Sequence, residues 1–283
     1  MTGVLAALGA ALAWTSASAL WRSLSGIGPA LQLNSLKNGL ATLLFLPVLL
    51  SLAWQEHLVG SLLLLASGVI GIAAGDSFYL AALRRLGTRR TLTVEAIGPV
   101  LASLGTVTLT GESLTARAWI GAALVSAAVL LIAWPRNSDR DSSFNRNGLL
   151  CSLIAVICGL SGAFLARQVL VAGDFSPLES AAIRLLGGAL ALLPFSARAW
   201  QKLPSQPASI NSRLVIATVL GTNLGIVLQQ VVFQQLPVGP GVTLMSTAPV
   251  MALVAARFEG DPLQPRGIAA AVLAVAGVAF TCL

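Results

Sequence analysis

Long apolar runs separated by short polar gaps dominate the chain. A helix that crosses a bilayer needs about 20 mostly apolar residues, and ten segments have roughly this length and character. These segments are 3–20, 30–52, 58–83, 91–110, 116–134, 148–171, 177–197, 212–236, 241–257 and 266–282. The pattern therefore predicts an all-α membrane protein with ten transmembrane helices.

The longest polar stretch predicts a division of the chain into two parts. We interpret residues 136–147 as a polar linker that separates a first five-helix repeat, 1–135, from a second, 148–283. At an offset of 150 the two parts align; the matching positions are 85–100 with 235–250, Gly71 with Gly221 and Gly75 with Gly225. Arg22 and Arg167 match at an offset of 145.

An odd number of helices in each repeat means that the two repeats must insert in opposite orientations. Inverted repeats are typical of secondary transporters, whose substrate site lies near the midplane between the repeats. The duplication therefore predicts a binding site where the two halves meet.

Composition excludes other classes of protein. Hydrophobic residues make up 56% of the chain and charged residues 10%, whereas soluble domains carry about 25% charged residues. A water-soluble enzyme and a disordered chain are both excluded on this ground. The net charge of +7 comes from basic residues in the short gaps, where they orient membrane proteins. We therefore expect membrane lipid and a small-molecule substrate as partners, and no nucleic acid.

Several motifs resemble one known superfamily. The stretch from Ala81 to Gly87, the triplet Gly98-Pro99-Val100 and the stretch Gly111-Glu112-Ser113-Leu114-Thr115 carry the resemblance. The second half repeats them as Ala248-Pro249-Val250 and the stretch from Phe258 to Leu263. With the ten predicted helices, these motifs resemble the drug/metabolite transporter superfamily, EamA type. The resemblance implies a secondary transporter, but this superfamily moves amino acids, drugs, nucleotide sugars and other metabolites.

The basic residues also predict an orientation. Ten crossings place both termini on one side, and 13 of the 17 Lys and Arg residues fall in gaps on the other side. The positive-inside rule makes that other side cytoplasmic. We therefore expect extracytoplasmic termini in an inner (plasma) membrane, although many relatives are taken to have cytoplasmic termini.

Four ionisable residues fall inside the apolar segments: Lys37, Asp76, Glu95 and Arg184. Such groups are costly in a bilayer and are functional candidates. Asp76 or Glu95 can take up a proton, and we select Glu95 as the candidate for proton coupling. A base can instead hold a carboxylate or a phosphate. The alternative for all four is a structural ion pair or a side chain that reaches the interface.

Other residues are candidates for lining a cavity. They are the aromatic residues Trp14, Tyr79 and Phe164 and the polar residues Ser18, Asn223 and Gln230. Aromatic walls suit an amphipathic solute. Asn223 and Gln230 lie seven residues apart and share a helix face, which can bind substrate or hydrogen-bond a neighbouring helix.

Prolines and glycines indicate how the helices bend and pack. Pro99 and Pro249 fall inside predicted helices, where proline causes a kink, so both are candidate hinges. Glycines spaced by four residues at 71 and 75, and at 221 and 225, are typical of helices that approach closely.

We therefore expect a secondary transporter of small polar metabolites that works by alternating access, with export of amino acids first and proton coupling as a hypothesis. The alternatives are transport of anionic or phosphorylated metabolites or of drugs, and a non-transporting membrane sensor or scaffold. A membrane protease is disfavoured because the only histidine, His57, lies outside the apolar segments. No metal cluster or nucleotide-binding loop is evident, so no metal or cofactor is expected. One chain carries both repeats, so a monomer or a homodimer is expected.

Overall fold

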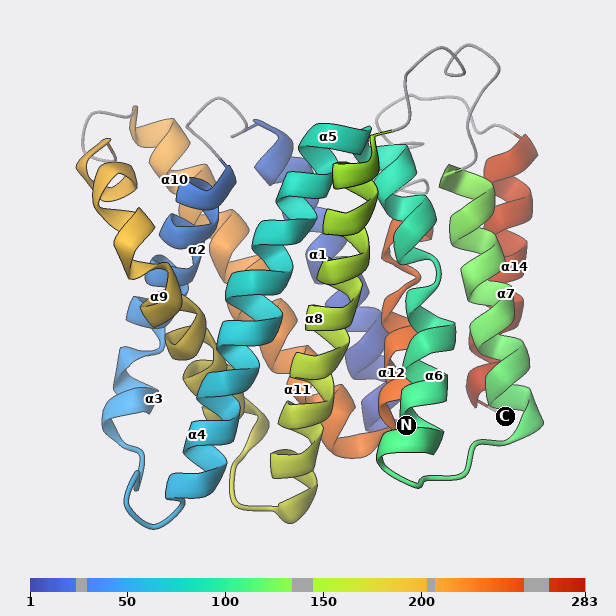
Figure 1. The fold of residues 1–283 in the computed structure, drawn as a ribbon, viewed down its shortest axis with the longest axis horizontal. Coiled ribbons are helices and arrows are strands. Elements are labelled where there is room, and N and C mark those ends of the chain that lie inside the picture. Colours follow the sequence, from blue (N-terminus) through green and yellow to red (C-terminus); the bar gives the residue numbers. More distant parts are fainter. Residues whose placement is uncertain (24–29, 134–144, 203–206, 252–264, 283) are drawn as a thin grey trace.

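The computed structural model describes residues 1–23, 30–133, 145–202, 207–251 and 265–282, and these are helical with short connections and no strand (Figure 1). In chain order the elements are α1 (Thr2–Ser23), α2 (Ala30–Leu44), α3 (Leu46–Leu50), α4 (Leu58–Ser67), η1 (Gly68–Gly75), α5 (Asp76–Glu95), α6 (Gly98–Leu109), α7 (Ala116–Ala133), α8 (Arg146–Ala172), α9 (Pro177–Lys202), α10 (Ala208–Ala217), η4 (Thr218–Leu224), α11 (Gly225–Gln235), α12 (Val238–Met245) and α14 (Pro265–Cys282). The elements η1 and η4 are π-helical.

The predicted all-α membrane fold is confirmed. Within the described ranges, seven helical segments are long and apolar enough to cross a membrane: 58–87, 90–109, 116–133, 146–172, 177–196, 208–235 and 265–282. They match seven of the ten predicted segments. In the remaining three, α1 has a shorter apolar stretch at Thr2–Ser18, α2 and α3 are separated at Phe45, and residues 252–257 lie outside the described part. The total of ten therefore stays a prediction, and most of the predicted linker 136–147 also lies outside.

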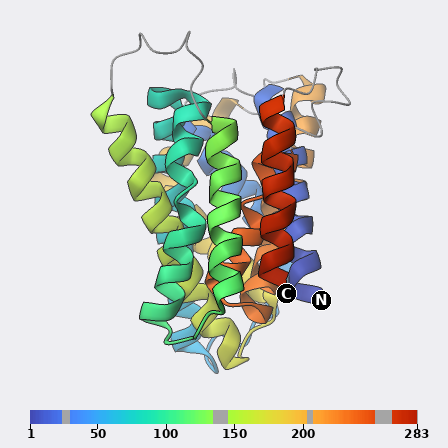
Figure 2. The same cartoon turned by 90° about the vertical axis from the view of Figure 1, so that its right-hand side faces the viewer.

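Both termini lie at the same end of the helical bundle in the two views (Figures 1 and 2). We call this end the terminal face and the other end the opposite face. Helix α1 runs away from the terminal face, whereas α8, the first helix of the second repeat, runs toward it (Figure 1). The connections 51–57, 110–115 and 173–176 lie at the terminal face. The two repeats thus run in opposite directions, as an inverted duplication requires.

Helix breaks recur at equivalent places in the two repeats. Helix α5 ends at Glu95, two residues form a turn, and α6 begins at Gly98. Helix α12 ends at Met245, two residues form a turn, and residues 248–251 are helical again. The offset between these breaks is the 150 residues found in the sequence.

The predicted kinks at Pro99 and Pro249 are wrong in their local structure. Pro99 lies in the first turn of α6, where a missing backbone N–H costs no helical hydrogen bond. Pro249 has the same place in the helical residues 248–251. Each proline therefore starts a new helix instead of bending a continuous one, and any hinge would lie in the turn before it.

Each repeat packs its first helix against the other repeat. Helix α1 contacts η4 and α11, and α8 contacts η1 and α5. Glycines make these contacts close, as predicted: a Cβ added at Gly221 would lie 2.5 Å from the Cβ of Ala17, and one at Gly225 would lie 2.5 Å from Nε1 of Trp14. Equivalent helices also pair, α2 with α9, α6 with α12 and α7 with α14. The repeats interlock, so residues that line their junction come from both.

Candidate functional site

An ion pair joins α2 to the start of α5. Nζ of Lys37 lies 2.6 Å from Oδ2 of Asp76, and the side chains are 21% and 38% exposed. Beside it, the side-chain amide of Asn34 donates a hydrogen bond to Oγ of Ser77 at 3.3 Å. Pairing lowers the cost of both charges in a membrane. The remaining exposure means that protein atoms do not enclose either charge completely.

Glu95 and Tyr79 lie near this ion pair although Glu95 is 19 residues further along the chain than Asp76. Both lie within electrostatic range of Asp76. A straight helix of 19 residues would place its ends about 28 Å apart, too far for such an interaction. Gly87 explains the proximity, because its φ of 76° and ψ of 165° break α5 and reverse the chain. The left-handed φ at this point favours glycine.

A buried polar chain links α9 to α11. Arg184 is 3% exposed, and its Nη1 donates to Oε1 of Gln229 at 3.1 Å. The same oxygen accepts from Nε2 of Gln230 at 3.4 Å, and Oγ of Ser180 donates to Oε1 of Gln230 at 3.0 Å. Arg184 also lies within electrostatic range of Asp76. Its Nε has no hydrogen-bond partner among the described residues.

Two predicted polar residues bond to other helices. The amide of Gln230 takes part in the chain above, and Nδ2 of Asn223 donates to the carbonyl of Ala41 on α2 at 3.0 Å. Both residues therefore hydrogen-bond neighbouring helices, which is one of the two roles expected for this face. Gln229, which contacts Arg184, was not among the predicted site residues because helical spacing grouped Asn223 with Gln230 instead.

The predicted aromatic residues lie at helix contacts. Trp14 packs against the hydrophobic core beside Gly225, and Phe164 covers Gly105 on α6. Ser18 is exposed, and its hydroxyl donates to the carbonyl of Trp14 in its own helix at 2.7 Å. In these described contacts the three residues do not join the charged cluster.

A second polar cluster lies toward the terminal face, and the predicted site residues did not include it. Nε and Nη2 of Arg167 donate to the carboxylate of Glu112 at 2.8–3.1 Å. Nη1 donates to the carbonyls of Phe233 at 2.7 Å and Leu236 at 2.6 Å. The sequence did contain a signal, because Arg167 matches Arg22 in the repeat and Glu112 belongs to the Gly111–Thr115 motif.

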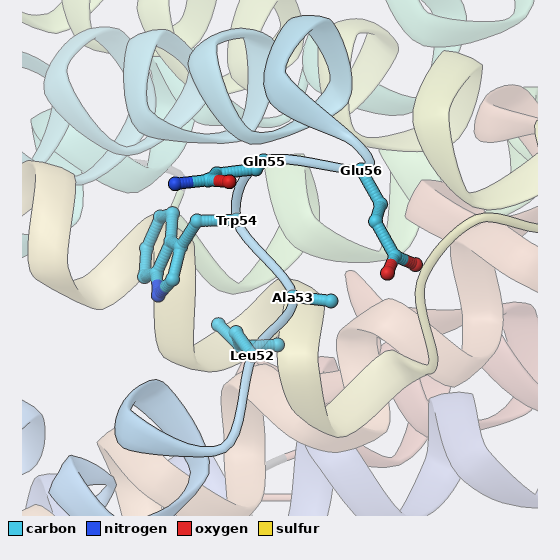
Figure 3. Close-up of a pocket in the computed structure, with 5 residues that line it drawn as sticks. All are labelled: Leu52, Ala53, Trp54, Gln55 and Glu56. Atoms are coloured by element: carbon cyan, nitrogen blue, oxygen red, sulfur yellow. The ribbon is translucent and has the colours of Figure 1, made fainter.

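A shallow hollow of about 360 Å³ lies in the connection between α3 and α4. It is lined by Leu52, Ala53, Trp54, Gln55 and Glu56, and the side chains of Trp54 and Glu56 point to different sides (Figure 3). Its polar groups do not converge on one point, and it contains none of the predicted residues. The charged cluster within the helices is therefore the better candidate site.

Comparison with known proteins gives two findings. The family model of the EamA-like transporter family matches the chain twice, at residues 1–134 and at residues 146–283. A solved crystal structure resembles the fold with a TM-score of 0.76 and 18% sequence identity, covering 98% of this chain and 95% of that chain. No curated protein matches the sequence. At 18% identity the structural likeness shows the fold alone.

Proposed function

Because the chain belongs to the EamA-like transporter family, we propose that it exports small polar metabolites by alternating access, with amino acids as the first candidates. Members of the family are membrane transporters of the drug/metabolite type, and the chain is a multi-pass membrane protein. The observation that carries the finer proposal is the partly exposed Lys37–Asp76 ion pair, at 2.6 Å within the membrane-spanning helices.

Charge balance favours a zwitterionic solute. The cluster combines the bases Lys37 and Arg184 with the acids Asp76 and Glu95, so its charges can cancel. Isolated charges are expensive to bury, whereas paired ones cost less. An amino acid carries both charges: Lys37 can hold its carboxylate, and Asp76 can hold its ammonium group. A solute that carries only one charge would leave one member of the ion pair without a partner.

Glu95 is the proposed site of proton coupling. A coupled ion drives a carrier only if it binds the two end states with different affinities. Glu95 lies within electrostatic range of Asp76, so gain or loss of its proton changes the charge beside the Lys37–Asp76 pair. Movement of the turn that follows Glu95 would alter this coupling between the end states.

A second candidate is the transport of anionic or phosphorylated metabolites. The observation that favours it is Nε of Arg184, which is buried and has no hydrogen-bond partner among the described residues. A phosphate or carboxylate oxygen can accept from such a donor. Transport of drugs, or a non-transporting role as a membrane sensor or scaffold, ranks below these two candidates.

The proposed location is the inner (plasma) membrane, with the terminal face outside the cytoplasm. The positive-inside rule supports this orientation, because most basic residues fall in connections at the opposite face. Since one chain contains both repeats, we propose that a monomer suffices, with a homodimer as the alternative.

Counterflow exchange in proteoliposomes tests the proposal. The panel contains neutral amino acids, their amides, phosphorylated metabolites and aromatic cations. We expect exchange of the amino acids and at least about tenfold slower exchange of the amides, which lack the carboxylate. Preference for phosphorylated solutes would favour the second candidate. If the folded protein exchanges none of these solutes, the proposal of an amino acid transporter is wrong.

Lys37→Gln is the matched test of the site, with Arg117→Gln as its control. Both substitutions remove one positive charge, but Arg117 is exposed at the start of α7. Only the first should slow exchange. Equal rates in the two variants would contradict a role of Lys37 in substrate binding.

A further inference from the structure

All five N–H groups of Arg167 have acceptors. Three bonds reach the carboxylate of Glu112, at 2.8, 3.0 and 3.1 Å. Two bonds reach the carbonyls of Phe233 and Leu236, at 2.7 and 2.6 Å. An arginine side chain carries five N–H donors in a planar fork, so this guanidinium is completely hydrogen-bonded although it is 11% exposed. Forked, charge-assisted contacts of this kind are among the stronger hydrogen bonds in proteins.

The acceptors of Arg167 belong to both repeats. Glu112 lies in the connection between α6 and α7, in the first repeat. Phe233 and Leu236 lie at the C-terminal end of α11, in the second repeat together with Arg167 itself. Carbonyls in the last turn of a helix lack helical partners and carry partial negative charge. Arg167 thus caps α11 and attaches the 110–115 connection to it.

A second contact joins the repeats at the terminal face. Nδ1 of His57, in the first repeat, lies 3.5 Å from Oδ1 of Asp174, in the second. The ring of His57 also meets the ring of Phe175 edge to face, with centroids 5.5 Å apart. The two halves are therefore tied together at two separate points of this face.

We propose that Arg167 is the lock that holds the terminal face closed, and that opening toward this face requires its bonds to Glu112 to break. The inference rests on the proposed alternating access. When the halves separate, Glu112 leaves and the guanidinium must find water instead. The two carbonyls stay with Arg167, because they belong to the same repeat. The lock therefore favours the closed state through the contacts with Glu112, while the contacts with α11 orient the guanidinium.

A buried cysteine below the lock measures how often it opens. Ala163 is 3% exposed and lies one helical turn from Arg167, on the side of the helix centre. In a variant that carries Ala163→Cys and lacks the native cysteines, a membrane-impermeant thiol reagent reacts from the terminal face only in the open state. The reaction rate then reports the open population. Measurements in vesicles of both orientations assign the reactive side.

Arg167→Gln and Glu112→Gln are each expected to raise this rate at least tenfold. The double variant should react no faster than Arg167→Gln alone, because that single change already removes the contact with Glu112. Arg117→Gln, which removes a charge near the same face, should leave the rate unchanged. A purely structural role for Arg167 would instead raise the rate from both sides of the membrane.

An unchanged rate in folded Arg167→Gln would overturn the proposal, as would an equal increase from both sides. If Arg167→Gln does not fold, Glu112→Gln decides, because it leaves the bonds to Phe233 and Leu236 in place. The measurement needs no transported solute. A failure of the lock is therefore distinguishable from a failure of the proposed transport activity, which the counterflow assay reports separately.

Discussion

Replacement of Gly68 by alanine tests the closest helix contact beside the charged cluster. Gly68 begins η1 and faces the backbone of α9 at Arg184. A Cβ at this position would lie 2.7 Å from the carbonyl carbon of Arg184 and 2.9 Å from its Cα, and nearer still to the carbonyl oxygen. These neighbours are backbone atoms, so no side-chain rotation can make room.

The expected cost follows from this geometry. The carbonyl carbon must retreat from 2.7 Å to the 3.4 Å of ordinary contact, which requires α4 and α9 to move apart. Overpacking of a tight interior costs about 1–3 kcal/mol, and the rigid neighbours place Gly68→Ala near the upper end. A loss of about 3 kcal/mol lowers the ratio of folded to unfolded protein by roughly 150-fold. Because Arg184 must shift, substrate exchange should also slow.

Unfolding by sodium dodecyl sulfate in mixed micelles, followed by circular dichroism, measures this free energy. Gly159→Ala on α8 is the matched control, because a Cβ there meets no heavy atom within 4 Å. In a helix alanine is favoured over glycine by about 1 kcal/mol, so the control should be neutral or stabilising. If Gly68→Ala unfolds within about 0.5 kcal/mol of the wild type, the close approach of η1 to α9 is refuted.

Three further predictions concern the site and one helix end. Glu95→Gln should abolish transport driven by a pH gradient and preserve counterflow exchange; intact pH-driven transport would exclude Glu95 as the coupling residue. Lys37→Gln leaves the Asp76 carboxylate without its 2.6 Å partner and should slow initial counterflow rates at least about tenfold; Asp76→Asn should do the same, and unchanged rates in both would contradict the proposed site. Ser176→Ala removes the acceptor for the backbone N–H of Glu179 and should lower the unfolding free energy by about 1 kcal/mol, with no loss arguing against a capping role.

Local sequence signals predicted local structure well. Ser176 and Glu179 were spaced as in a capping box, and both bonds are present: the backbone N–H of Ser176 donates to Glu179 at 2.8 Å, and that of Glu179 donates to Oγ of Ser176 at 3.3 Å. The prolines were harder to interpret. A proline inside an apolar run can kink a helix or start a new one, and Pro99 does the second.

The candidate site was predicted only as a set of unusual residues. The cost of charge in a bilayer identified Lys37, Asp76, Glu95 and Arg184 without any knowledge of their partners. The pairing of Lys37 with Asp76 and the hydrogen bond from Arg184 to Gln229 depend on helix packing. No periodicity within one helix contains that information.

The sequence by itself determined the membrane-embedded helical fold and its duplication. Backbone groups in a bilayer must find partners within their own segment, so each apolar run specifies a helix locally, and the offset of 150 residues is visible without coordinates. Only the tertiary structure decided which polar groups meet. The reversal at Gly87 returns Glu95 toward Asp76, and the interlocking of the repeats brings Arg167 to Glu112, 55 residues away in the chain. Such contacts arise from helix breaks and close packing between distant segments, which the residues at either end of the contact do not encode.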